Sequence, residues 1–162
     1  MIRTGRKRQF ILYLTLLSVL VLSMEGCVTE PASLQQPSAV LGRIQFETHC
    51  AACHQPDGSG AVGGGPPLAD SSWVSGPPSR LIRLVLQGVR GPIVVNGKTY
   101  NREMIGFGPV ATDQEIAALL TYVRGQWGGI EERIRPEDVG RIRQATTTKI
   151  GYWTVEELLD IP

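Results

Sequence analysis

The sequence is poor in the residues that most metal and cofactor sites use. Its 162 residues include three Cys, two His and three Met, and aromatic side chains make up 6%. Sixteen Lys and Arg nearly balance fifteen Asp and Glu, which argues against a nucleic-acid binder with its usual basic surface. No run reaches the ~18 apolar residues of a clear membrane span. The 42% of hydrophobic residues argues against a disordered chain. Because the sequence has so few residues that could bind a metal, each of them can be considered individually.

Residues 1–26 have the pattern of an export signal. Four basic residues come first, and a mostly apolar run from Phe10 to Met24 follows. That run suits a signal peptide and is short for a spanning helix. It ends at Gly26-Cys27, which resembles a bacterial lipobox, where the Cys is lipidated and becomes the mature N-terminus. We expect a lipoprotein lipidated on Cys27, with an uncleaved anchor or an ordinary cleaved signal as alternatives.

Residues 27–38 come next and have the composition of a linker. After Cys27 they contain two Pro, two Ser and no apolar periodicity. Such a segment is expected to be a flexible tether between an anchor and a folded body. Together with the signal, it predicts an exported protein on the periplasmic side of a membrane.

One short motif indicates the chemistry of the site. Cys50-Ala51-Ala52-Cys53-His54 is C-x-x-C-H, the attachment signature of c-type haem. Its two thiols, one helical turn apart, can add to the two vinyl groups of one haem, and His54 then faces the iron. A thioredoxin-like C-x-x-C would need a βαβ context, and a zinc site would need a second ligand pair. We therefore predict one covalent haem c on Cys50 and Cys53, with His54 as the proximal ligand.

The sixth iron ligand is found by elimination. Once the signal is removed, Met104 is the only Met, and His49 is the only other His. His49 directly precedes Cys50, so it is held on the proximal side and cannot easily reach the opposite haem face. Met104 lies in a Gly-flanked irregular segment, off any periodic apolar stripe. We predict that Met104 is the second axial ligand, with a core-filling Met as the alternative.

Local patterns predict three helices and one hairpin. A first helix is expected from a cap at Ser38 up to the motif. A second is expected over 78–88, opened by Pro77-Pro78 and ended by Gly88. A third should follow the capping box that begins at Thr112 and end at Gly128. Residues 93–100 predict a β-hairpin around an Asn-Gly turn.

Residues 55–110 are rich in loops, with eleven Gly and seven Pro. Such a segment could not build a sizeable protein core on its own. Wrapped around a large, flat, apolar cofactor it would not need to, because the haem would form the centre.

This order of features resembles a class I cytochrome c domain of the bacterial monohaem type. The resemblance covers about residues 39–128 and rests on the segments CAACHQPDGSG, GGPPLADSSWV and NGKTYNREMIGFGPVATDQEIAALLTYVRGQWG. It implies a mostly α fold, with three main helices around a covalent haem and a small β-hairpin insertion. It also implies that a Pro carbonyl, at Pro66 or less favourably Pro67, bonds the proximal imidazole Nδ1–H, and that Leu68 packs on the haem.

The resemblance further implies that the first and last helices cross tightly, with Gly42 and Phe46 against Tyr122. Three residues have donors that suit a haem propionate, although a surface or core position without that role is the leading interpretation for each: Trp73, Arg90 and Tyr100.

The C-terminal extension, residues 129–162, is expected to contain short helices. One would start at Pro136, and another at the capping box formed by Thr154 and Glu157. The extension either wraps over the haem domain or docks a partner protein.

A haem with both axial positions filled by protein has no open site for substrate. We therefore predict an electron-transfer protein that is not an enzyme, working between periplasmic or membrane redox proteins. Its expected partners are redox proteins and, through the lipid anchor, the membrane; no nucleic acid or small-molecule substrate is expected. Two alternatives remain: a haem subunit of a larger respiratory or dehydrogenase complex, and a ligand-binding or peroxidatic haem protein in which Met104 is displaceable.

Overall fold

The structure, a computed structural model, describes residues 35–162, with side chains from Ser38 onward. The predicted signal and the predicted lipidation site Cys27 lie outside these residues, as does most of the predicted tether. Within the described part, no helix is long and apolar enough to span a bilayer.

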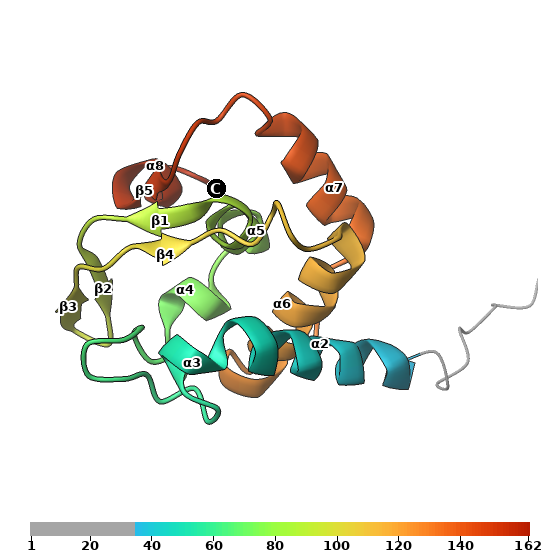
Figure 1. Ribbon diagram of the computed structural model, residues 1–162, viewed down its shortest axis with the longest axis horizontal. Coiled ribbons are helices and arrows are strands. Elements are labelled where there is room, and N and C mark those ends of the chain that lie inside the picture. The colour runs from blue at the N-terminus through green and yellow to red at the C-terminus, as the bar shows by residue number, and fades with distance from the viewer. Residues whose placement is uncertain (1–34) are drawn as a thin grey trace, which may run out of the picture. The chain divides into compact units, whose positions relative to one another are not determined.

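Two long helices, α2 (Gln35–His49) and α6 (Asp113–Trp127), cross each other in the lower part of the view in Figure 1. Gly42 makes this approach possible, because a Cβ there would lie 2.7 Å from Tyr122 Cβ and would also collide with the Ala118 carbonyl. Phe46 is fully buried, with its ring centroid 5.9 Å from Tyr122 and 4.6 Å from Trp127. The crossing that the resemblance implied is confirmed.

The helix ends follow local sequence signals closely, with one exception. Helix α5 (Pro78–Gln87) ends at Gly88, which has a φ of 81°. At the start of α6, the Thr112 side chain accepts from Glu115 N and the Glu115 carboxylate accepts from Thr112 N, which confirms the capping box. The exception is α2, which begins at Gln35 and not after Ser38. Pro37 in its first turn is no obstacle, because N–H groups there have no partner inside the helix.

The attachment motif does not continue α2 but forms the short helix α3 (Ala51–His54). A second short helix, α4 (Ser72–Ser75), packs against α5 and α6. These two short helices and the loops between them lie on one side of the α2–α6 crossing (Figure 1).

The predicted hairpin is present as β2 (Ile93–Val95) and β3 (Lys98–Tyr100), joined by Asn96 and Gly97 with φ values of 50° and 74°. Two positive φ angles in a row are what a tight primed turn requires. A second, three-stranded sheet was not predicted. Its order is β4 (Met104–Ile105), β1 (Gly88–Arg90), β5 (Trp153–Thr154), with β1 antiparallel to β4 and parallel to β5.

The C-terminal extension packs on the rest of the fold. Helix α7 (Pro136–Ala145) lies against α6 and α5, and α8 (Val155–Leu159) lies against α5 (Figure 1). Both helices start where their sequence signals predicted. Val139 and Leu158 are fully buried. The extension therefore covers the body, as the first of its two interpretations expects.

Candidate haem site

The motif places its two thiols in different surroundings. Cys50 is 9% exposed and Cys53 is exposed, with His54 buried between α3 and the following loop. Burial, together with the nearby Cys53 thiol, raises the pKa of Cys50 to about 12, so this thiol is protonated at neutral pH. One sulfur thus lies inside the fold and the other at its surface.

His54 is held in one tautomer by the backbone. Its Nδ1 lies 2.8 Å from the carbonyl oxygen of Pro66. Because a carbonyl only accepts, the ring proton is on Nδ1, and Nε2 carries the lone pair. Burial lowers the pKa of His54, and the bond to Pro66 opposes that shift only in part. The ring is therefore neutral, the form that a metal ligand needs, and of the two expected Pro carbonyls it is Pro66 that makes the contact.

Gly65 contributes to the site, although sequence reasoning did not single it out. A Cβ on Gly65 would lie 2.8 Å from His54 Cε1 and 2.9 Å from Nδ1, so only a bare backbone fits beside the ring. Its N–H also donates to the carbonyl of Cys53 at 2.9 Å. The run of three Gly before Pro66 was the available signal.

An apolar cavity opens beside the motif. Its lining comes from α2, α3, α4, α5, α6 and the strands, and its polar members are His54 and Ser71, besides the indole of Trp73. The lining residues are Phe46, Cys50, His54, Leu68, Ser71, Trp73, Val74, Leu81, Leu84, Val85, Val89, Ile93, Met104, Leu119, Leu120 and Val123. The chemistry of these walls suits a large hydrophobic cofactor attached through Cys50, because the lining is mostly apolar and includes an imidazole and a thioether.

Met104 reaches this cavity from a strand and not from an irregular loop. It lies in β4, paired with Val89 of β1, and is partly buried. His49 does not line the cavity. Its ring lies 5.2 Å from that of Phe107, just after β4. The part of the chain that the structure describes holds no cluster of three His, Cys, Asp or Glu side chains that could bind a metal ion by itself.

The other expected pocket residues differ in their contacts. Leu68 lines the cavity. Trp73 lines it too, but its only donor, Nε1–H, bonds the Val94 carbonyl at 3.1 Å and is not free for a propionate. Tyr100 packs on the core from β3 without lining the cavity, and Arg90 lies in a separate polar hollow that also contains Arg102. The propionate expectation therefore needs correction at Trp73.

Comparison with known proteins supports this chemistry. Cytochrome c-552 of Thermus thermophilus is 40% identical over 83 residues, which are 49% of this chain and 63% of the relative. The gluconate 2-dehydrogenase cytochrome c subunit of Pantoea cypripedii is 33% identical over 116 residues, 67% of this chain and 25% of the relative. The fructose dehydrogenase cytochrome subunit of Gluconobacter japonicus is 31% identical over 111 residues, 63% and 22% respectively. The chain thus spans less than two thirds of each of these relatives.

The family model for cytochrome c matches residues 39–127, more than half of the chain. Members of this family bind covalently attached haem c, and Cys50 and Cys53 have the attachment spacing. This protein belongs to the cytochrome c family and holds haem c through its C-x-x-C-H motif.

Proposed function

We propose that this protein carries single electrons between periplasmic or membrane redox proteins, with His54 and Met104 as the axial ligands of its haem. The observation that carries the proposal is that both side chains line one apolar cavity whose wall also includes Cys50. A haem held by these two side chains would supply one-electron exchange between Fe(III) and Fe(II), and the Met104 thioether would raise its potential. A carrier of this kind needs no substrate site and is not an enzyme.

The protein's own residues keep that geometry constant. The Pro66 carbonyl holds the proton on His54 Nδ1, which fixes the ring and leaves Nε2 for the iron. The apolar walls exclude water, so less solvent has to reorganise when the charge of the site changes. Pairing of β4 with β1 limits the movement of the Met104 backbone.

Met104→Ala tests the ligand set. We expect the wild-type ferric protein to show the weak absorption band of a Met–iron bond at the edge of the near infrared. The variant should lose this band, have a lower potential and bind CO in the ferrous state. An unchanged low-spin spectrum in the variant would reject Met104. A wild type that already binds CO would favour the ligand-binding or peroxidatic alternative.

Two dehydrogenase cytochrome subunits among the relatives favour a second candidate, a haem subunit of a larger complex. Both candidates share the ligand set and differ only in the partner. Affinity isolation of the full-length protein from solubilised membranes separates them: a stable dehydrogenase in the eluate favours a subunit, and none favours a free carrier.

We further propose that lipidation of Cys27, which lies outside the described residues, holds the carrier at the periplasmic face of a membrane. Cys27→Ser should release the protein into the soluble fraction or stall its processing, while the haem spectrum stays unchanged. Fractionation of cells followed by haem staining measures this. A soluble wild type would reject the anchor.

A further inference from the structure

The segment that follows β4, residues 106–111, is held from one side by α5. The N–H groups of Phe107 and Gly108 donate to the carbonyls of Val85 and Leu86, each at 2.9 Å. The fit is close, because a Cβ on the first residue of the segment would lie 2.5 Å from the Leu86 oxygen. We call this segment the 106–111 loop.

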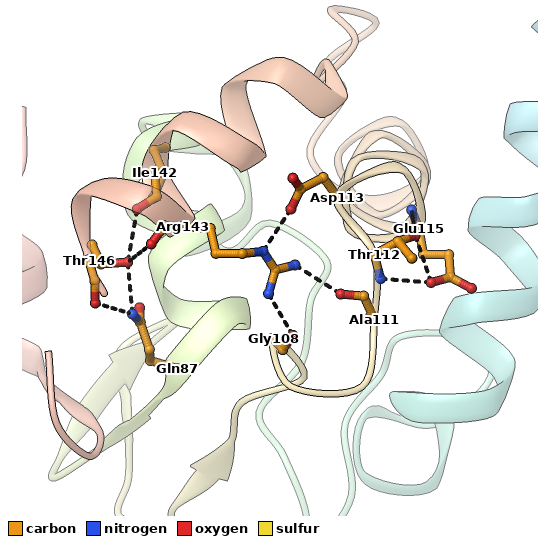
Figure 2. Close-up of polar contacts among 9 residues, drawn as sticks. All are labelled: Gln87, Gly108, Ala111, Thr112, Asp113, Glu115, Ile142, Arg143 and Thr146. Carbon is orange, nitrogen blue, oxygen red and sulfur yellow. Dashed lines mark hydrogen bonds and ion pairs between the residues drawn. The ribbon is translucent and has the colours of Figure 1, made fainter. Parts of the chain in front are cut away.

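Arg143 of α7 holds the same loop from the other side. Figure 2 shows its guanidinium pointing toward the loop and the start of α6. Nη1 donates to the Gly108 carbonyl at 2.5 Å, Nη2 to the Ala111 carbonyl at 2.9 Å, and Nε to Asp113 Oδ1 at 2.7 Å. A planar fork of donors can join three acceptors in this way, and the compact ammonium of Lys cannot.

We expect the contacts of Arg143 to hold the 106–111 loop more firmly than an exposed surface ion pair would. The side chains of Arg143 and Asp113 are 33% and 37% exposed, so the pair is partly shielded from water. Two of the three acceptors are loop carbonyls, one at its third residue, Gly108, and one at its last, Ala111. Hydrogen bonds from a charged donor are stronger than neutral ones. The loop is therefore fixed against both α5 and α7.

The end of α7 is also tied to the strand beside Met104. The Gln87 amide donates to the Thr146 carbonyl at 3.1 Å and to its hydroxyl at 2.8 Å (Figure 2), and its oxygen accepts from Trp153 Nε1 at 2.8 Å. Gln87 immediately precedes β1, whose Val89 pairs with Met104. Residues of the C-terminal extension thus contact both the loop that follows β4 and the residue that precedes its partner strand β1.

We propose that Arg143 is a positioning residue for the axial methionine: by holding the 106–111 loop, it keeps Met104 at the iron. The proposal rests on the proposed ligation by Met104. Arg143 lies beyond residues 39–127, which the family model matches, so the extension would add a second support to the ligand segment.

The test compares Arg143→Ala and Arg143→Lys with Arg141→Ala, a matched control that breaks a surface pair with Asp138 on the same helix. We expect Arg143→Ala to weaken the Met–iron band and to raise the apparent affinity of the ferrous protein for CO. The rise should be about tenfold, the order expected for losing a hydrogen bond from a charged donor. Arg143→Lys, which keeps a charge beside Asp113, should restore only part of the band.

The remaining outcomes separate the proposals. A wild type without the band rejects Met104 ligation and the role of Arg143 with it. A wild type with the band, together with an unchanged Arg143→Ala or an equal effect of Arg141→Ala, rejects the role of Arg143 alone. Full rescue by Lys rejects the fork on the loop carbonyls. If Arg143→Ala does not accumulate, hydrogen exchange of the Phe107 and Gly108 amides in Arg143→Lys decides, and wild-type protection there rejects the proposal.

Discussion

The imidazole of His54 is held entirely by backbone. The carbonyl of Pro66 accepts from its Nδ1, and the bare Cα of Gly65 lies against the ring. A side chain in either place could move with its rotamer, whereas a backbone atom in a short, well-bonded turn cannot. The orientation of the ring is therefore set by the path of the chain between α3 and α4.

Gly65→Ala should disturb this arrangement. The added methyl group would meet the imidazole closer than van der Waals contact allows, so the ring or the turn must shift. We expect less holoprotein, a changed haem spectrum and a loss of about 1–3 kcal/mol in unfolding free energy. Optical spectra and denaturant titrations of the purified protein measure these effects.

Gly125→Ala is the matched control, because an added Cβ there has only the Ile130 carbonyl within 4 Å, at 3.9 Å. It should leave the spectrum unchanged and stabilise α6 slightly. A normal spectrum in Gly65→Ala would show that the turn can move and that close approach at Gly65 is not needed.

At the scale of elements, the crossing of α2 and α6 depends on Gly42. Two helices pack at a distance set by the side chains at their contact. With no side chain at Gly42, the backbone of α2 lies against the Ala118 carbonyl and the Cβ of Tyr122. The closeness of the helices also brings Phe46 into contact with Trp127.

Gly42→Ala should force the two helices apart. We expect a loss of about 1–3 kcal/mol in unfolding free energy, measured by denaturant titration, even though Ala is the better helix former. The same Gly125→Ala substitution serves as the control, because it changes helix propensity alone. A more stable Gly42→Ala protein would mean that propensity outweighs the close contact.

Local sequence signals, each spanning only a few residues, predicted the helices and the hairpin well. The capping boxes at Thr112 and Thr154 place the starts of α6 and α8, and the Asn96-Gly97 turn places the hairpin. The strands β1, β4 and β5 were missed because two or three residues are too short for any period to show. Their pairing depends on a partner such as Trp153, far away in the sequence.

The candidate site likewise consists of residues that the sequence predicted and of contacts that it did not. The C-x-x-C-H spacing selected Cys50, Cys53 and His54 as candidates, and the scarcity of Met and His selected Met104. The fork from Arg143 and the bond from Trp73 to Val94 join residues that are distant in sequence. No spacing rule connects such pairs, so only the folded chain shows them.

For the whole molecule, the apolar cavity lies within the protein core. Buried side chains from five helices line this space, and a haem attached at the motif would add apolar contacts to them. The stability of the fold should therefore depend on attachment of the cofactor.

Replacement of both Cys50 and Cys53 by Ala should sharply reduce the amount of folded protein. Immunoblots of exported protein and circular dichroism measure the yield and the helix content. Gly125→Ala is the control, because it leaves the attachment motif intact and adds a Cβ where there is space for it. A double variant with normal yield and helix content would show that the fold does not need haem at its centre.

The three-stranded sheet also implies an order in which the parts of the site form as the chain emerges. A chain leaves the ribosome or an export channel with its N-terminal end first. The thiols at 50 and 53 emerge early, but β1 gains its parallel neighbour only when Trp153 arrives, and the 106–111 loop gains Arg143 only shortly before. Cofactor attachment can thus precede the final fixing of the second ligand. Newly made molecules should pass through a short-lived stage in which haem is covalently bound and CO can still bind in place of Met104.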